Sequence, residues 1–209
     1  MKKSSEIIIN NLINRYSKLE VCKQEIIDAV EVLIEAYKGH HKLLVCGNGG
    51  SASDSEHIVG ELMKGFVKKR TIPDELREKL NDDELSSYLQ GALPAISLTV
   101  ENALSTAFSN DQNPVFCFAQ QVYGLGVQND VLLCISTSGN SKNCVYAGKV
   151  AKALNMKLIS LTGQKASNLE KISDVTIHAP EIETYKIQEC HLPIYHCICL
   201  VLENEFFEE

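Results

Sequence analysis

The stretch Lys42–Ser53, which reads KLLVCGNGGSAS, decides the fold that we expect for this chain. Its continuous apolar run predicts a strand that is buried on both faces, as in a parallel sheet. The strand leads directly into a glycine-rich turn, and helical periodicity follows the turn. Such a turn lets backbone N–H groups approach an anion at the helix N-terminus. The stretch therefore predicts a strand–turn–helix unit of an α/β protein, with a ligand site at the turn.

The rest of the chain repeats this alternation of short apolar strands and helices. The alternation predicts right-handed crossovers and a parallel sheet covered on both faces, so we expect a doubly wound α/β domain with a five-stranded parallel sheet. The predicted strands are 42–46, 94–99, 130–136, 157–162 and 174–177. The predicted helices are 52–69, 101–109, 113–124, 141–155, 166–172 and 184–206.

Two segments fall outside this alternation. From Ser4 to Lys38, apolar residues recur every three to four positions, which predicts an N-terminal extension of one long or two consecutive amphipathic helices. Residues 71–90 carry Pro73 and a group of acidic residues, and they predict a charged, partly helical insertion. We therefore divide the chain into N-terminal helices at 1–40 and an α/β domain at 41–209 that contains this insertion.

Composition excludes several classes of function. The net charge of -7 argues against a nucleic-acid partner, because binding phosphate backbones requires clustered Lys and Arg. No apolar run approaches the ~20 residues that cross a bilayer, and the N-terminus carries no export signal, so we expect a cytoplasmic protein without a membrane partner. The eight cysteines lack close C-x-x-C spacing, and we interpret them as reduced residues, mostly in the core.

A second turn also ends a predicted strand and precedes a predicted helix. Residues 136–141 read STSGNS, with hydroxyl side chains at Ser136, Thr137, Ser138 and Ser141. One Ser or Thr is enough to cap a helix, so four favour a ligand site. Hydroxyl groups at a strand end are suited to binding a phosphate. Neither turn matches a nucleotide-binding motif, because no G-x-G-x-x-G with its acidic partner and no G-K-[ST] is present in them.

Five separated motifs resemble, in order and approximate spacing, those of the SIS-domain sedoheptulose 7-phosphate isomerases, also called phosphoheptose isomerases. The motifs are Gly47–Ser51, Ser109–Asp111, Ser136–Ser141, Leu161–Gly163 and Ile187–Glu189. The resemblance extends over about residues 1–205. It implies a flavodoxin-like SIS domain, and a homotetramer in which the N-terminal helices form part of the oligomer core.

The resemblance also implies a zinc ion, one per subunit, held by His57, Glu61, Gln188 and His196. His57 and Glu61 are four residues apart on a predicted helix, so they share one face. Gln188 and His196 are separated by eight residues, or ~12 Å of helical rise. His191 is the easier partner of Gln188 on geometry alone. The resemblance favours His196, and His191 remains the alternative.

The activity implied by the resemblance is an aldose–ketose isomerisation, with sedoheptulose 7-phosphate and D-glycero-D-manno-heptose 7-phosphate as the expected pair. Glu61 would move a proton between adjacent carbons, and His196 would act as an acid toward the sugar oxygens. Zinc would polarise the carbonyl group. The residues expected to contact substrate are Asn48, Gly49, Gly50, Ser51, Glu61, Asn110, Asp111, Ser136, Thr137, Ser138, Ser141 and Gln188.

Two alternatives compete with this function. The chain could be a noncatalytic SIS module that binds a phosphosugar or a protein, or an isomerase of another sugar phosphate. The insertion at 71–90 and the residues 183–186 depart from the pattern of the heptose enzymes, and either departure could reshape the pocket.

Overall fold

The centre of the molecule is an all-parallel sheet of five strands, as expected from the sequence, and the strand order is β2-β1-β3-β4-β5. The computed structural model describes residues 1–207, so the last two residues of the predicted 41–209 domain lie outside it. The strands are β1 (Leu43–Gly47), β2 (Ala95–Ser97), β3 (Val131–Ile135), β4 (Lys157–Gly163) and β5 (Val175–Ala179). Every residue of β1 and β3 is buried, which confirms the prediction from their apolar runs.

The strand order places a topological switch point between β1 and β3. Along the chain, β1 is followed by β2 on one side, whereas β3 lies on the other side and leads on to β4 and β5. Gly47 at the end of β1 pairs with Ile135 at the end of β3. The two turns singled out in the sequence therefore lie side by side at the carboxyl edge of the sheet, where ligands bind in open α/β folds.

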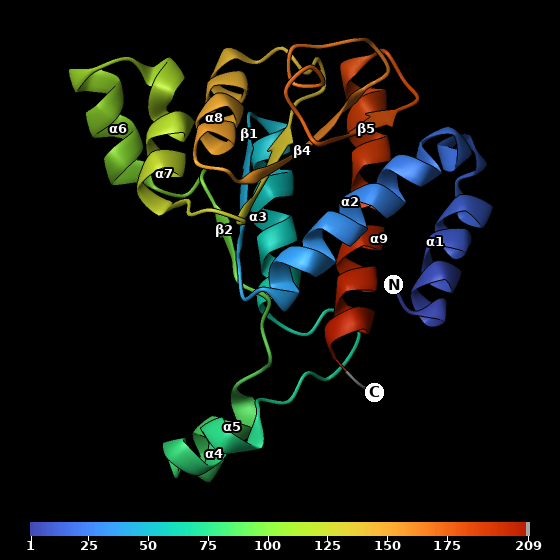
Figure 1. Cartoon of the computed structure of the whole chain (residues 1–209), viewed down its shortest axis with the longest axis vertical. Coiled ribbons are helices and arrows are strands. Elements are labelled where there is room, and N and C mark those ends of the chain that lie inside the picture. The colour runs from blue at the N-terminus through green and yellow to red at the C-terminus, as the bar shows by residue number, and fades with distance from the viewer. Residues whose placement is uncertain (208–209) are drawn as a thin grey trace.

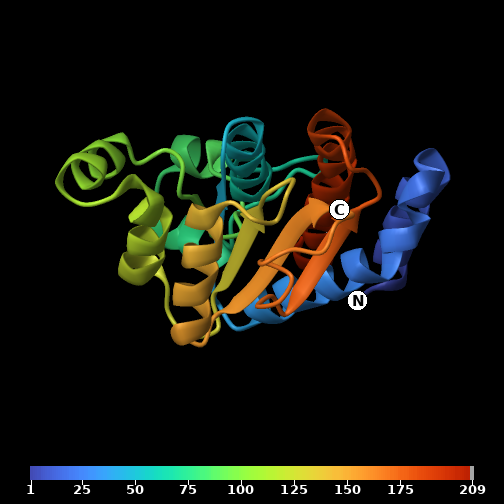
Figure 2. The same ribbon diagram turned by 90° about the horizontal axis from the view of Figure 1, so that it is seen from above.

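Helices cover both faces of the sheet (Figures 1 and 2). One apolar cluster joins one face to side chains of α1, α2, α3 and α9, and a second cluster joins the other face to α7 and α8. The helices of the two layers and their flanks are α1 (Lys3–Arg15), α2 (Lys23–Lys38), α3 (Gly50–Met63), α6 (Asn102–Asp111), α7 (Cys117–Leu125), α8 (Lys142–Ala153) and α9 (Thr184–Phe206). Short 3₁₀ turns at Ser17–Cys22 and Pro114–Phe116 precede α2 and α7.

The helix that follows the glycine-rich turn, α3, ends earlier than predicted, at Met63. Arg70 explains this end, because its guanidinium group donates to the last carbonyls of the helix. Nη1 donates to the carbonyl of Leu62 at 2.7 Å and Nη2 to that of Glu61 at 3.0 Å. Carbonyls in the last turn of a helix lack partners within the helix, so the guanidinium group serves as its C-terminal cap.

The carboxylate of Glu203, on α9, is the third hydrogen-bond partner of the Arg70 guanidinium group. Arg70 Nε donates to it at 2.8 Å, and the backbone N–H groups of residues 66–68 donate to it at 2.8 to 3.1 Å. Both side chains are buried, at 0% and 2% exposure. Burial opposes ionisation of Glu203, but the backbone donors and Arg70 outweigh it and lower the pKa of the carboxyl group. This ion pair joins α3 to α9.

The predicted insertion forms an arm of two short helices, α4 (Asp74–Leu80) and α5 (Asp83–Tyr88). Figure 1 shows the arm projecting from the body on two extended segments. The N–H of Gly91 donates to the carbonyl of Arg70 at 3.1 Å, so the segment leaves and rejoins the body at one place. Its apolar side chains are largely exposed, including Leu85 and Tyr88.

The helix predicted at 166–172 is wrong, because the structure has turns there. Ser167 and Glu170 form the reciprocal hydrogen bonds of a helix start, with the N–H of Ser167 donating to Glu170 and the N–H of Glu170 donating to Ser167 Oγ. The N–H of Leu169, however, donates to the carbonyl of Gly139 at 3.0 Å. That bond ties the segment to the hydroxyl-rich turn. The N–H of Asp174 donates to the carbonyl of Leu158 on β4, which ties the other end of the segment to the sheet.

All eight cysteines lie in the described part of the chain and are buried free thiols, as predicted. Three of them, Cys46, Cys134 and Cys144, lie together beneath the two turns, and the sulfur atoms of Cys46 and Cys134 are 3.5 Å apart. Within residues 1–207, no helix combines the length and the apolar character that spanning a bilayer requires.

Candidate active site

The glycine-rich turn connects β1 to α3 in a conformation that requires glycine. Gly49 has φ of +57°, in the region that disfavours residues with a side chain. Asn48 is tied to Asn143 in the first turn of α8 by two amide hydrogen bonds, of 3.0 and 2.7 Å. Ser51 is buried and its carbonyl accepts a bond from Ser55 at 2.8 Å. The turn therefore offers Asn48, Gly49 and Gly50 at the surface, whereas Ser51 supports it from within.

The hydroxyl-rich turn connects β3 to α8, and it also needs a glycine. Gly139 has φ of +62°, and a Cβ atom there would lie 2.3 Å from Ser167 Oγ. Ser136 Oγ donates to Ser141 Oγ at 3.0 Å, so these two hydroxyl groups hold the turn together. Thr137 and Ser138 instead line a cavity of about 210 Å³, which also touches the start of α9. The turn thus presents two hydroxyl groups to this cavity.

Three of the four predicted metal ligands converge between α3 and α9. His57 Nε2 lies 3.2 Å from Glu61 Oε1, across one turn of α3. The same nitrogen lies 3.5 Å from His196 Nε2 on α9. Lys64 Nζ approaches the other oxygen of Glu61 at 3.1 Å. Residues far apart in the sequence thus bring two imidazole groups and a carboxylate to one place.

We refer to His57, Glu61 and His196 together as the trio. Their imidazole nitrogen and carboxylate oxygen atoms are ligands that zinc binds in proteins. With bonds of about 2.0 to 2.1 Å, neighbouring ligand atoms of a tetrahedral zinc ion lie about 3.4 Å apart. The separations from His57 to Glu61 and to His196, 3.2 and 3.5 Å, match that spacing. Within residues 1–207, however, no three His, Cys, Asp or Glu side chains form a group that could hold a metal as they stand. The side chains must therefore adjust for a metal to bind.

The surroundings of His196 favour its neutral form. Partial burial lowers the pKa of its imidazole below the ordinary 6.5, and the neighbouring His57 lowers it further, against the opposing effect of Glu61. A neutral imidazole keeps a lone pair on one nitrogen, which a metal ligand needs. The Phe66 ring lies beside the imidazole in a tilted arrangement, with the ring centroids 5.5 Å apart.

Gln188 lies elsewhere along α9. Its side chain packs against Gly50, where a Cβ atom would lie 2.6 Å from Gln188 Nε2. Because Gly50 meets Gln188 near the start of each helix and His57 meets His196 farther along, α3 and α9 run side by side in the same direction. Within residues 1–207, no described contact joins Gln188 to the trio. Its assignment as a ligand stays a prediction.

His191, the alternative ligand, faces away from the trio. Its side chain is fully buried, and Nε2 lies 3.2 Å from the carbonyl of Thr162 on β4. Burial lowers the pKa of this imidazole to about 4, so the ring is neutral at physiological pH. The structure therefore favours His196 over His191 as the residue that joins His57 and Glu61.

Asn110 and Asp111, at the end of α6, are exposed, and the amide of Asn110 donates to the carboxylate of Asp111 at 2.9 Å. Within residues 1–207, no described hydrogen bond joins either side chain to the two turns or to the trio. Their substrate contacts remain a prediction from the resemblance.

Two residues that support His57 were not recognisable from the sequence. Tyr195 Oη lies 3.0 Å from His57 Nδ1, and it donates to Asp54 Oδ1 at 3.2 Å. Asp54 precedes His57 by three residues on α3, a spacing that puts both on one side of the helix. Tyr195 is next to His196 and nearly fully buried. A polar residue three positions before a candidate ligand is too common to be informative by itself.

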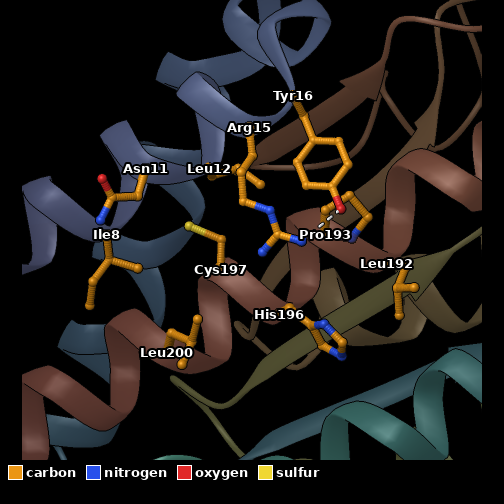
Figure 3. A pocket seen from close by; sticks show the side chains of 10 residues that line it. All are labelled: Ile8, Asn11, Leu12, Arg15, Tyr16, Leu192, Pro193, His196, Cys197 and Leu200. Carbon is orange, nitrogen blue, oxygen red and sulfur yellow. Dashed lines mark hydrogen bonds between the residues drawn. The ribbon is translucent and has the colours of Figure 1, made fainter.

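A cavity of about 470 Å³ lies between α1 and α9, away from the two turns. Figure 3 shows its lining from both helices, with the Arg15 guanidinium donating to the Tyr16 hydroxyl at 3.2 Å. His196 is the one candidate site residue in its wall, and its ring points away from α1 (Figure 3). The cavity therefore borders the trio from the side opposite α3.

Comparisons with known proteins agree on one family. Residues 9–90 and 118–195 match two family models, each described as an SIS domain. A phosphoheptose isomerase of Helicobacter pylori is 38% identical over 90% of this chain and 88% of that protein. One from Campylobacter jejuni is 37% identical over 90% of each. The solved phosphoheptose isomerase of Francisella tularensis has a TM-score of 0.74 and 30% identity, with 98% of this chain and 100% of that chain covered. The solved phosphoheptose isomerase of Neisseria gonorrhoeae has a TM-score of 0.71 and 28% identity, with 93% of this chain and 98% of that chain covered.

Proposed function

Because this chain belongs to the phosphoheptose isomerase family of SIS-domain proteins, we propose that it interconverts sedoheptulose 7-phosphate and D-glycero-D-manno-heptose 7-phosphate. The coarser statement, that it is an aldose–ketose isomerase acting on a sugar phosphate, follows from its family. The observation that supports catalysis by this chain is the convergence of Glu61 with His57 and His196 between α3 and α9.

Glu61 is the base in this proposal. Its carboxylate would take a proton from the carbon next to the ketose carbonyl, while the carbonyl oxygen gains a proton and an enediol forms. Returning the carbon-bound proton to the neighbouring carbon, with loss of a proton from the other oxygen, gives the aldose. His196 would exchange the protons of the sugar oxygens. General acid and base groups of this kind contribute about 10² to 10⁴ in rate.

We propose zinc as the cofactor, held by His57, Glu61 and His196, with Gln188 as the fourth ligand after a movement from Gly50. When bound, zinc would polarise the sugar carbonyl and hydroxyl groups. The distances from His57 Nε2 to Glu61 and to His196, which match the ligand spacing of a tetrahedral zinc ion, support this choice. His57 also has a hydrogen-bonded partner on its other nitrogen, which is usual for a metal-binding imidazole.

The phosphate would bind at the hydroxyl-rich turn. Thr137 and Ser138 line the cavity there, and Lys165 in its wall supplies a positive charge. Neutral donors and one cation are a suitable set for a phosphate monoester. The sugar would then extend past the glycine-rich turn, which the strand pairing places next to the hydroxyl-rich turn. Asn48, Gly49 and Gly50 would contact its hydroxyl groups.

We further propose a homotetramer in the cytoplasm. The apolar cavity between α1 and α9, together with exposed apolar side chains such as Leu192, supports burial of this face in an assembly. The eight free thiols support a reducing compartment.

The proposal is tested by incubating purified protein with sedoheptulose 7-phosphate, fructose 6-phosphate or ribulose 5-phosphate, with and without added zinc, and following products by NMR. We expect turnover of the first sugar. Glu61→Gln and His196→Asn should lower the rate by about 10² or more, because each removes a proton-transfer group. Glu56→Gln is the matched control, since Glu56 lies on the same helix and bonds only Thr99 among the described residues. A Glu61→Gln variant as active as the Glu56→Gln variant would contradict the role of the base.

The noncatalytic SIS module is the second candidate, supported by the observation that no group within residues 1–207 could hold a metal as it stands. Absence of turnover with all three sugars, together with less than stoichiometric zinc in protein purified without chelator, would favour this candidate. Turnover of another sugar alone would keep the isomerase and correct the substrate.

A further inference from the structure

Three side chains form a hydrogen-bonded chain that ends on His57. Tyr195 Oη donates to Asp54 Oδ1 at 3.2 Å and lies 3.0 Å from His57 Nδ1. Asp54 and His57 are on α3, whereas Tyr195 is on α9. The proposed reaction makes no use of Asp54 or Tyr195, so their arrangement needs another explanation.

The direction of these bonds favours one tautomer of His57, whereas the contact of its Nε2 with the Glu61 carboxylate favours the other. An ionised carboxylate accepts hydrogen bonds and donates none, so the single hydroxyl hydrogen of Tyr195 goes to Asp54. The phenol oxygen can then only accept from His57, which places the imidazole proton on Nδ1. His57 Nε2 is left with its lone pair, and this is the atom that lies 3.2 Å from Glu61 and 3.5 Å from His196.

The imidazole of His57 depends on this chain for its orientation. Its side chain is 41% exposed, so packing alone leaves the ring room to turn. Tyr195, by contrast, is only 2% exposed and has a fixed place in the core. The ring of Tyr195 meets that of His57 edge to face, with centroids 5.5 Å apart and planes at 74°. The buried phenol thus holds the exposed imidazole by a hydrogen bond and by contact.

A purely structural explanation accounts for only one of the two bonds. A buried tyrosine hydroxyl usually finds one partner, and Asp54 already provides it. The second bond connects the phenol to a residue of the proposed metal site. Outer partners of this kind set the tautomer and ring orientation of metal-binding histidines, and their loss commonly weakens metal binding 10- to 100-fold.

We propose that Asp54 and Tyr195 are positioning residues that hold His57 as its Nδ1–H tautomer, with Nε2 directed at Glu61 and His196. The hydrogen-bond geometry supports the Nδ1–H tautomer of His57. That this tautomer strengthens metal binding rests on the proposed function. Asp54 and Tyr195 act through His57 and have no direct contact with substrate in this proposal.

Two measurements on the full chain test this. In metal-free protein at pH 8.5, two-bond ¹H–¹⁵N correlation spectra of the imidazole rings report the tautomer of His57, assigned by its loss in His57→Asn. We expect Nδ1–H in the wild type and a shift toward Nε2–H in Tyr195→Phe. Zinc affinity is then measured by competition with a chromophoric chelator, and we expect about 10- to 100-fold weaker binding in Tyr195→Phe and Asp54→Asn.

Tyr37→Phe is the matched control, because Tyr37 is also buried and its hydroxyl donates to a backbone carbonyl, that of Pro94, at 3.3 Å. Tyr37→Phe should leave the tautomer of His57 and the zinc affinity unchanged. In the His57→Asn background, Tyr195→Phe should weaken zinc binding no further, because the lost effect passes through His57.

The outcomes separate the two proposals. An Nε2–H tautomer in the wild type, or zinc affinity in Tyr195→Phe equal to that of Tyr37→Phe, overturns the positioning role even if the enzyme binds zinc and turns over. A wild type that binds no zinc but shows the Nδ1–H tautomer, lost in Tyr195→Phe, overturns the proposed cofactor and supports the positioning of His57.

Discussion

At the scale of single residues, Gly50 determines how close the glycine-rich turn can come to α9. It is the first residue of α3, and the missing side chain leaves room for the amide of Gln188. A close approach of this kind is a reason for glycine that does not depend on unusual backbone angles. Gly50 therefore couples the turn expected to bind the sugar to a predicted metal ligand.

Gly50→Ala should displace Gln188 and impair turnover. The new Cβ atom would start 2.6 Å from Gln188 Nε2, so the amide must move. Displacement of a site group by about 1 Å can cost up to about 100-fold in rate, and we expect kcat/KM to fall by roughly 10- to 100-fold. Steady-state kinetics measure this.

The control is Gly60→Ala on the same helix, where a Cβ atom meets nothing within 4 Å among the described residues. That substitution should leave turnover unchanged and stabilise the helix by up to about 1 kcal/mol. Similar kinetics for both variants would show that the amide of Gln188 has no fixed place in the site.

Some site residues can be predicted from the sequence and others cannot. The spacing of His57 and Glu61 on a helix already places them on one face. The choice between His191 and His196 is not visible in the spacing, because it depends on which side of α9 faces the sheet and which faces α3. Tyr195 and Asp54 form a contact between two helices 141 residues apart in the sequence, and no local pattern reports such a contact.

At the scale of elements, the buried pair of Arg70 and Glu203 holds together the two helices that carry the trio. Arg70 caps the end of α3, and Glu203 fixes it to α9. Removing one partner from a buried ion pair leaves an uncompensated charge, which costs several kcal/mol.

Glu203→Gln should lower the free energy of unfolding by roughly 3 to 5 kcal/mol, because Arg70 loses its charged partner in a buried place. Urea unfolding followed by circular dichroism measures the change. The exposed pair of Lys79 and Glu75 provides the control, and Glu75→Gln should change stability by less than about 1 kcal/mol. Equal effects of the two substitutions would contradict a structural role for the buried pair.

The five strands and most helices follow from apolar periodicity, since burial on both faces leaves a clear signal in β1 and β3. Two helix predictions fail for a common reason. Hydrogen bonds outside the local helix pattern set both the early end of α3 and the turns at 166–172. Arg70 donates to Leu62 and the N–H of Val67 donates to Glu203 in the first case, and the N–H of Leu169 donates to Gly139 in the second. The helix propensities of the residues in a segment carry no information about hydrogen-bond partners outside it.

At the scale of the whole molecule, the arm of α4 and α5 is an addition to a complete core. Among the described residues, neither helix contributes a side chain to the two apolar clusters. The ends of the arm meet at the bond between Gly91 and Arg70. The length and charge of the segment predicted an insertion, but its helices and its projection from the body depend on packing that the sequence does not specify.

Replacing residues 73–89 with a four-residue glycine–serine loop should leave the fold intact. The ends already lie within hydrogen-bonding distance, and the cost of closing a loop changes only slowly with its length. We expect a melting temperature within a few degrees of the wild type and retained turnover, measured by calorimetry and by the NMR assay. A variant that fails to fold would show that the exposed apolar side chains of the arm complete the structure.

The buried thiols allow local opening of this protein to be measured by chemical labelling. Cys46 and Cys134 lie at the middle of the sheet with no exposed surface, so a thiol reagent reaches them only when the centre of the domain opens. The labelling rate of unmodified protein, compared with that of the denatured chain, therefore reports the free energy of opening at the switch point. Ligand that closes the site should slow this labelling, so that occupancy can be followed without any introduced probe.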